Sequence, residues 1–219
     1  MKVFKFGGAS VQSIDRIKNL AQLMRAEKEH ILVVVSAMGK TTNALEEVAA
    51  AFYKGRNEEA LKLFEVIKQQ HLSTLKALVT LTLKQASEEL ANFFTEVEWL
   101  LHDTAVREYG YYYDQIVCIG ELLSTSILSS FLNEEKIMNK WMDVRDIIRT
   151  DDAFQDAIID WDFTQHKVTE LVLPAFEKYG LIITRDLLGL QMKMKVPPWA
   201  VRGAIILPRY LPICLMRNL

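Results

Sequence analysis

The sequence predicts an α/β fold in which a mainly parallel sheet is sandwiched between helices. A strand-like segment opens the chain, an amphipathic helical segment follows it, and a second strand-like segment is apolar throughout. A strand, a helix and a further strand within about 35 residues form a βαβ unit, whose connection is right-handed in almost all proteins. This unit sets the expectation of a parallel sheet.

Each element of the unit has its own signal. Val3, Phe4 and Phe6 are β-branched or aromatic, which favours a strand. Over residues 13–28, apolar side chains recur at helical spacing, and Ser13 is a suitable N-cap. Residues 31–35 form a continuous apolar run, which is typical of a central parallel strand buried on both faces.

A glycine pair, Gly7 and Gly8, directly follows the first strand. A strand, a glycine pair and a helix allow the backbone to approach a phosphate group closely. Lys5 supplies a compact positive charge beside the glycines. Taken alone, such a pair is more often a tight turn, and such a lysine a solvated strand end. The spacing differs from G-x-G-x-x-G, which excludes the dinucleotide-binding fingerprint.

A polar loop, residues 36–43, follows the second strand, and a helical pattern resumes after it. Gly39, Lys40 and Thr41 resemble the end of a P-loop, but that motif needs a glycine where the chain has Val34, inside the strand. The plain alternative is a polar loop at a helix start. Hydroxyl groups and free backbone N–H groups at a helix N-terminus suit a carboxylate ligand.

Residues 57–105 are predicted to be helical throughout, with apolar side chains at helical spacing and no evident chemistry. His71 and His102 are expected at the surface or at helix ends, because neither has a second ligand at metal-binding spacing. Residues 114–125 are predicted as an apolar helix with a lone glutamate, Glu121. Burying an unpaired carboxylate is expensive, so a surface position is the plain alternative for Glu121.

The remaining segments complete the βα pattern. Asp143 and Arg145 are expected to pair with each other. A helix is predicted over residues 168–179, with Gly180 as its C-cap. Residues 181–184 are predicted to form the last strand.

The composition limits the class of protein. Half of the 219 residues are hydrophobic, which suggests one domain with a substantial core and argues against disorder. The net charge of −2 gives no indication of nucleic acid or an anionic membrane surface as partners, and the apolar runs are too short to cross a bilayer. Two cysteines are too few for a disulfide framework, and no leader sequence opens the chain. We therefore expect a cytoplasmic protein that binds neither nucleic acid nor membranes.

Four segments, in order, resemble those of aspartate kinases, in the amino-acid kinase superfamily. They are Lys5-Phe-Gly-Gly-Ala-Ser-Val11, Ser36-Ala-Met-Gly-Lys-Thr-Thr-Asn43, Asp114-Gln-Ile-Val-Cys-Ile-Gly-Glu-Leu-Leu-Ser-Thr125 and Lys140-Trp-Met-Asp-Val-Arg-Asp-Ile-Ile-Arg-Thr-Asp151. The family has Thr where this chain has Ala9, which removes one hydroxyl group near the phosphates. The resemblance covers residues 1–184 and implies an amino-acid kinase fold, incomplete at the C-terminus, with residues 57–105 as a helical insertion at one edge of the site.

The resemblance implies roles for the residues of the first two loops. Lys5 is expected to be catalytic, neutralising charge on the phosphoryl group of ATP as it transfers. Gly7, Gly8 and Ser10 are expected to cradle the phosphates, and Ser36 to lie near the nucleotide. Mg²⁺ is expected to arrive with ATP, carried by phosphates and water, with no metal ligands from the protein.

The expected amino-acid partner is L-aspartate. The resemblance implies that Thr42 contacts the substrate and that Glu121 binds its α-ammonium group, an opposite charge that offsets the cost of burial. The implied reaction is ATP-dependent phosphorylation of the aspartate side-chain carboxylate to aspartyl 4-phosphate, the first step toward lysine, threonine and methionine. The intact family member is expected to be a homo-oligomer.

Two alternatives remain open. Another amino-acid kinase, acting on glutamate or acetylglutamate, is an enzymatic alternative, although a Glu121 placed for a free ammonium group argues against an acetylated amine. A non-catalytic remnant or interaction domain is the alternative from another class.

The pattern changes after Thr184. Residues 187–219 contain five Lys or Arg residues and no Asp or Glu, a charge of +5, together with four of the five prolines. Aspartate kinases continue with Gly-Phe-Ile-Gly and then Gly-Arg-Glu-Gly-Ser-Asp, and neither motif is present. Codons that encode the chain from Arg185 onward can be chosen so that they encode both motifs, in order, when they are read from the third base of codon 185. This shifted reading frame is called the hidden frame. Restoring one base in codon 185 would replace Arg185 by Gln and continue in the hidden frame.

We therefore expect residues 185–219 to be a non-native, frameshifted tail, with a divergent but real tail as the alternative. In the family, the missing motif carries the Arg that binds the substrate α-carboxylate and the Asp beside the transferring phosphoryl group. The chain as given is accordingly expected to be inactive or nearly so.

Overall fold

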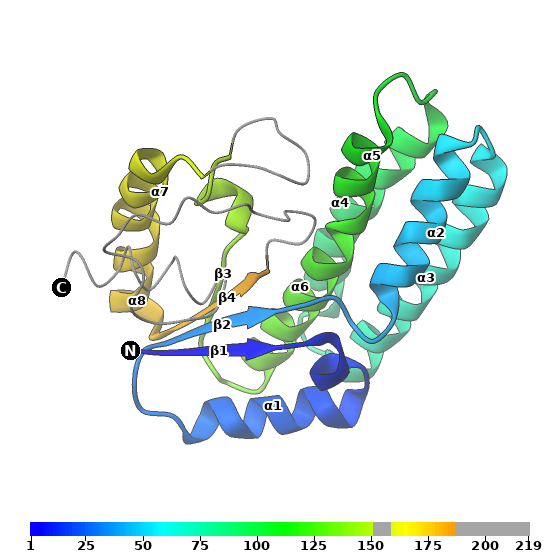
Figure 1. The fold of residues 1–219 in the computed structure, drawn as a ribbon. Helices are drawn as coiled ribbons and strands as arrows, with labels where there is room; N and C mark the ends of the chain where they lie inside the picture. The colour runs from blue at the N-terminus through cyan, green and yellow to red at the C-terminus, as the bar shows by residue number, and fades with distance from the viewer. Residues whose placement is uncertain (151–158, 187–219) are drawn as a thin grey trace.

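The computed structural model describes residues 1–150 and 159–186, which form an open sheet with helices on both sides (Figure 1). The strands are β1 (Lys2–Phe6), β2 (Ile31–Val35), β3 (Lys140–Trp141) and β4 (Leu181–Arg185). The α-helices are α1 (Ile14–Ala26), α2 (Thr41–Tyr53), α3 (Asn57–Leu78), α4 (Leu83–His102), α5 (Tyr109–Val117), α6 (Ile119–Glu134), α7 (Trp161–Lys167) and α8 (Leu173–Tyr179). Shorter turns are η1 (Gly8–Val11), η2 (Val144–Asp146) and the π-helical η3 (Val168–Val172).

The described strands form one parallel sheet in the order β1-β2-β4-β3. Val35 is level with Phe6 of β1 on one side and with Arg185 of β4 on the other. The carboxyl ends of these three strands therefore lie at one edge of the sheet. The predicted parallel α/β fold is confirmed, and the last strand extends one residue beyond the predicted Thr184.

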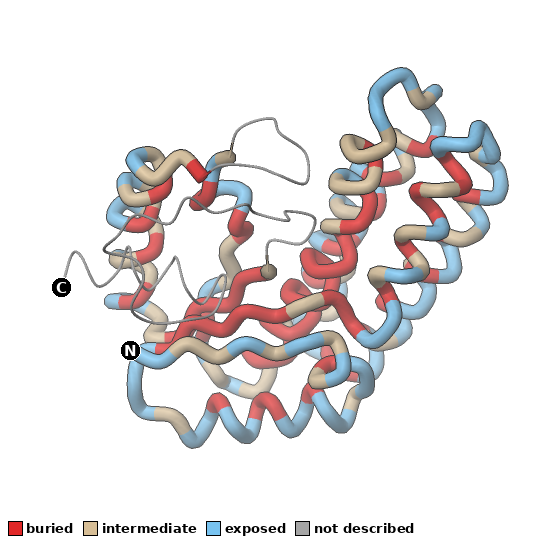
Figure 2. Tube along the Cα trace, in the orientation of Figure 1, coloured by how far each residue is buried: buried red, intermediate tan, exposed pale blue. Residues whose placement is uncertain are grey.

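Each face of the sheet supports its own apolar core, because successive side chains of a strand point to opposite faces. Ile31, Val33 and Val35 of β2 pack in the larger core with helices α1 to α6. Leu32 and Val34 pack in the smaller core with η2, α7, η3 and α8. Figure 2 shows the buried residues running along β2 and β4 and along the inner sides of the helices. The continuous apolar run of β2 is thus explained by burial on both sides.

Helix α6 is the central helix of the larger core, and nearly all its residues from Ile119 to Leu132 are buried. The predicted helix over 114–125 is in fact divided at Cys118 into α5 and α6. Together, residues 109–134 are long and apolar enough to pass for a membrane span, which the sequence analysis did not anticipate. In the fold, 83% of the apolar window is buried, as in the core helix of a soluble protein.

The helix ends follow the predicted signals. The Ser13 side chain accepts a hydrogen bond from the backbone N–H of Arg16 and caps α1. Gly180 ends α8 with a φ of 67°, in the left-handed region that glycine adopts without strain. Residues 57–105, expected to be helical throughout, form two helices, α3 and α4, which are separated by residues 79–82, and the second helix ends at His102. Residues 187–219 of the predicted tail lie outside the described residues.

His71 corrects one expectation. It was predicted at the surface or at a helix end, but it lies in the middle of α3 with only 1% of its surface exposed. It continues the apolar stripe of Phe64, Ile67 and Leu75, and that spacing was the informative signal. Its ring Nδ1 lies 2.7 Å from the carbonyl oxygen of Ile67, while Nε2 is buried without a partner. Exposed His102, at the end of α4, matches its prediction.

The burial of His71 predicts a loss of stability in mild acid. Burial lowers the pKa of the imidazole from its ordinary value of 6.5, so the folded state keeps the ring neutral while the unfolded chain binds a proton. The free energy of unfolding should therefore decrease as the pH falls below about 6.5. Urea titrations from pH 5 to pH 8 should show this slope in the unaltered chain and a weaker slope in His71→Phe. Equal slopes would contradict the assignment.

The burial of Asp114 predicts that stability increases in mild acid, the opposite of the trend predicted for His71. Its Oδ1 atom is buried without a hydrogen-bond partner, and burial raises the pKa of the carboxyl group from 3.8 to about 6. The folded state therefore holds the proton more tightly, and stability decreases as the pH rises from about 4 to about 6. Asp114→Asn should stabilise the chain at pH 7 by about 1 kcal/mol, allowing for solvent screening of a partly exposed group. The gain should vanish near pH 4, and a gain that persists there would refute this explanation.

Candidate active site

The predicted site residues gather at the carboxyl edge of the parallel sheet. The loop after β1 contains the glycine pair, the loop after β2 contains Ser36 and leads to Thr42, and β4 ends at Arg185. The start of α6 carries Glu121. In parallel α/β sheets, ligands bind outside the carboxyl ends of the strands. The loops from distant parts of the chain thus meet at the edge where a ligand is expected.

The first two loops are held against each other by close backbone contacts. The backbone N–H of Gly39 donates to the carbonyl oxygen of Gly8 at 3.0 Å, and that of Ser36 donates to Phe6 at 3.0 Å. A Cβ atom on Gly8 would lie 2.5 Å from the carbonyl oxygen of Ala37. Gly8 therefore permits a close approach between the loops, in addition to any approach to a phosphate.

Gly7 is different from Gly8. No atom lies within 4 Å of the position that a Cβ would occupy on Gly7, so the space beside it is open. Gly7 is extended, and its carbonyl oxygen accepts a hydrogen bond of 2.8 Å from the backbone N–H of Ser10. The loop between β1 and α1 is thereby folded into the short helical turn η1, next to an open space at the end of β1. This arrangement fits the predicted phosphate cradle.

Helix α6 packs against the second loop and holds it in place. Ser124 donates a hydrogen bond of 2.9 Å to the carbonyl oxygen of Ser36. A Cβ on Gly120 would lie 3.1 Å from the side chains of both Ala37 and Thr41, so a larger residue would push the loop away. The hydroxyl group of Thr41 is buried without a hydrogen-bond partner, although the prediction singled out its half-buried neighbour Thr42. An orphaned buried hydroxyl at the site is a group that a polar ligand could satisfy.

Glu121 is fully buried, with none of its surface exposed. The plain alternative of a surface position is therefore wrong. The guanidinium group of Arg185 supplies the opposite charge, with Nη1 at 3.8 Å from Glu121 Oε2. A buried carboxylate needs such compensation, because desolvation of a lone charge costs several kcal/mol or more.

The same arginine reaches a second carboxylate. Arg185 Nε lies 3.7 Å from Asp143 Oδ1. Asp143 also accepts from Arg145 Nε at 2.7 Å, as the predicted pair between these two residues requires. The cluster of Glu121, Asp143, Arg145 and Arg185 thus holds two acidic and two basic groups.

Lys5 lies at the solvent side of the site. Its side chain is 37% exposed and forms an ion pair with Asp186, which is 14% exposed. Asp186 directly follows Arg185, so two consecutive residues join Lys5 to Glu121. Neither Arg185 nor Asp186 is among the predicted site residues. The signal was available, since they follow a predicted strand at the edge where the other loops meet.

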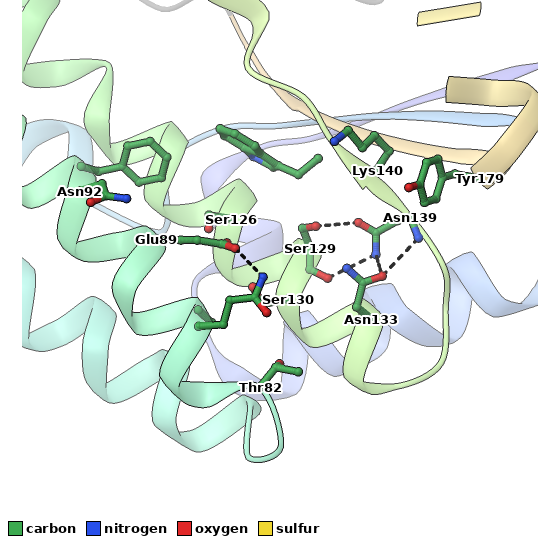
Figure 3. A pocket seen from close by; sticks show the side chains of 14 residues that line it. Thr82, Glu89, Asn92, Ser126, Ser129, Ser130, Asn133, Asn139, Lys140 and Tyr179 are labelled. Carbon is green, nitrogen blue, oxygen red and sulfur yellow. Dashed lines mark hydrogen bonds between the residues drawn. The ribbon is translucent and has the colours of Figure 1, made fainter. Parts of the chain in front are cut away.

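Two observations concern other parts of the described chain. Within residues 1–150 and 159–186, no three His, Cys, Asp or Glu side chains gather in a way that could hold a metal ion. A cavity of about 670 Å³ lies between α4, α6 and the start of β3 (Figure 3). Ser129, Asn133 and Asn139 form a hydrogen-bonded network at its wall. None of the predicted site residues lines this cavity, so it is separate from the carboxyl-edge site.

Comparison with known proteins identifies relatives of this chain. The model of the amino acid kinase family matches residues 1–182. Lysine-sensitive aspartokinase 3 of Escherichia coli is 29% identical over 191 residues, covering 87% of this chain and 41% of the relative. Chloroplastic aspartokinase 2 of Arabidopsis thaliana is 33% identical over 182 residues, covering 80% of this chain and 31% of the relative. The chain thus spans less than half the length of these relatives.

Solved structures give the same result. The structure of E. coli aspartokinase III in complex with lysine and aspartate has a TM-score of 0.73 and 28% identity, covering 84% of this chain and 40% of that chain. The structure of the same enzyme with aspartate and ADP has a TM-score of 0.72. The family match over residues 1–182 includes β1, β2, the loops that follow them and the start of α6. The chain therefore belongs to the amino acid kinase family.

Proposed function

We propose that the described residues form the part of an aspartate kinase that holds L-aspartate and the terminal phosphates of ATP. The supporting observation is the convergence of Lys5, the two loops and Glu121 at one edge of the sheet. The bound aspartate and ADP of the similar E. coli enzyme support this choice of ligands. The whole protein would transfer a phosphoryl group to the aspartate side chain and release aspartyl 4-phosphate.

Lys5 and the first loop serve the nucleotide in this proposal. ATP, when bound, supplies the phosphoryl group, and the protein contributes mostly positioning and charge neutralisation. Lys5 faces the developing charge, while Gly7, Gly8 and Ser10 provide backbone groups beside the open space at the end of β1. Ser36 is held near the phosphates by its backbone bonds to β1 and α6. Mg²⁺ comes with the phosphates and has no assigned protein ligand.

Glu121 and the second loop serve aspartate. The buried carboxylate of Glu121 suits the α-ammonium group of an amino acid, because a cation is the partner that a buried anion requires. Thr42, with the orphaned hydroxyl of Thr41 beside it, lies at the N-terminus of α2, where the helix dipole favours a carboxylate. The substrate carboxylate is thereby directed toward the loop that also meets the phosphates.

Ligand binding tests these assignments. L-Aspartate with Mg·ADP, each at about ten times its Kd, should raise the Tm of the chain by roughly 3–6 °C per ligand. Glu121→Gln should lose the aspartate part of the shift and keep the nucleotide part, while N-acetyl-L-aspartate should give no shift. Glu88→Gln, an exposed change on α4, is the matched control. An aspartate shift that is equal in Glu121→Gln would contradict the role of Glu121.

The tail enters the proposal as a frameshift. The motif that would bind the substrate α-carboxylate and neighbour the phosphoryl group is missing from residues 185–219 and can be spelled in the shifted frame. We expect purified residues 1–219 to have no measurable aspartate-dependent ATP turnover in a coupled ADP-release assay. Independent sequencing of the DNA around codon 185 should reveal one additional base. Codons incompatible with the hidden frame, or clear turnover by this chain, would refute the frameshift.

A further inference from the structure

The cavity between α4, α6 and the start of β3 has the size and the walls of a small-molecule site (Figure 3). Its volume of about 670 Å³ lies in the range of such sites, which are often found between packed helices. Gln85, Glu89 and Asn92 of α4 line it and are exposed, so a molecule from solvent can reach it. The proposed function makes no use of this cavity.

One part of the wall is a hydrogen-bonded network that holds its own shape. Asn139 has only 5% of its surface exposed, and its amide nitrogen donates to Asn133 Oδ1 at 3.0 Å and to the carbonyl oxygen of Ser129 at 3.2 Å. The hydroxyl group of Ser129 donates in turn to Asn139 Oδ1 at 2.7 Å. A buried polar network whose members are satisfied is rigid. This wall is therefore preorganised.

Ser126, on the turn of α6 before Ser129, has a hydroxyl group that is still available. Only 4% of the residue is exposed, and it lines the cavity (Figure 3). Within residues 1–150 and 159–186 no hydrogen bond engages this hydroxyl group, whereas those of Ser124, Thr125 and Ser129 are all engaged. Buried hydroxyl groups in proteins nearly always have a partner. The Ser126 hydroxyl group thus marks a place where a polar atom of an occupant would bind.

Aromatic rings form another part of the wall. The ring centroids of Phe93 and Trp141, both of which line the cavity, are 5.9 Å apart. The indole Nε1 of Trp141 donates to the hydroxyl group of Thr125 at 2.9 Å, which fixes the orientation of the ring. Fixed aromatic rings offer a large apolar surface in a cavity whose other walls are polar. An occupant with both apolar and polar surfaces fits such walls.

The charges of the wall favour an uncharged occupant. Among the described residues that line the cavity, Glu89 and Lys140 are the charged ones, and their charges cancel. Glu89 also accepts a hydrogen bond of 3.1 Å from Gln85. Phosphate and carboxylate ligands are typically held by arginine or lysine clusters, which this wall lacks. The remaining polar groups are hydroxyls and amides, which both donate and accept hydrogen bonds, as the hydroxyl groups of a ligand do.

We propose that this cavity binds an uncharged saccharide, with one face of the sugar ring against Phe93 and Trp141 and a ring hydroxyl group on Ser126. A pyranose ring has C–H groups on its faces and hydroxyl groups around its edge. The aromatic part of the wall complements the faces, and the hydroxyl and amide groups complement the edge. The proposal is independent of the proposed function, because none of the residues assigned to aspartate or ATP lines the cavity.

Saturation-transfer difference NMR on the full chain tests the proposal, with D-glucose and maltose as probes. Both sugars should show transfer, and sorbitol, which has hydroxyl groups but no ring, should show much less. Ser126→Ala should weaken sugar binding by about threefold to tenfold, the usual effect of one lost hydrogen bond. Alanine is a strong helix former, so this variant should fold.

Glu88→Gln is the matched control, because Glu88 is exposed on α4 and does not line the cavity. It should bind both sugars as the unaltered chain does. Absence of transfer from both sugars, equal affinity in Ser126→Ala, or equal transfer from sorbitol would overturn the proposal. The proposed function would be unaffected by any of these results.

The indole N–H signal of Trp141 locates the bound sugar. Trp141→Phe identifies this signal in the proton–nitrogen correlation spectrum of the full chain. Maltose should shift the Trp141 signal, while the signals of Trp99 and Trp161, which do not line the cavity, should stay in place. Sugar binding that leaves the Trp141 signal unchanged would contradict the proposal.

Discussion

The parallel alignment of the strands is the constraint on which the site depends. Because β1, β2 and β4 run in the same direction and end level with each other, the residues after Phe6, Val35 and Arg185 reach one edge. The polypeptide segments involved are far apart in the sequence. An antiparallel strand in the middle would have sent one of these loops to the other end of the sheet. The candidate site therefore depends on the parallel direction of the strands more than on any single side chain.

Two glycines allow close packing at the carboxyl edge of the sheet. Gly8 brings the first loop within backbone contact of the second, and Gly120 lets α6 pack against the second loop. In both places a Cβ atom would meet neighbouring atoms at 3.1 Å or less. The open space beside Gly7 remains at the end of β1, where neither loop fills it. Close packing of the loops and an unfilled space are thus produced by adjacent residues.

Buried charge is concentrated at the same edge. Glu121 is carried on the most buried helix of the larger core, and its charge is balanced by Arg185 from β4. Burying charges in this way contributes little to stability, since the desolvation cost offsets much of the attraction. The burial of this carboxylate at the start of a core helix is consistent with the binding role proposed for Glu121.

The sequence by itself determined the alternating βα pattern, the strands at the apolar runs, the caps at Ser13 and Gly180, and the family motifs, because these depend on local periodicity and residue type. It also predicted a site formed by the loops after the first two strands and by Glu121, and the structure brings these segments to one edge of the sheet. It could not determine that His71 is buried, that the helix before Glu121 divides at Cys118, or that Arg185 and Asp186 pair with Glu121 and Lys5. The two ion pairs join residues more than 60 positions apart in the sequence, and only the tertiary structure decides which charges become neighbours and which side chains are removed from water.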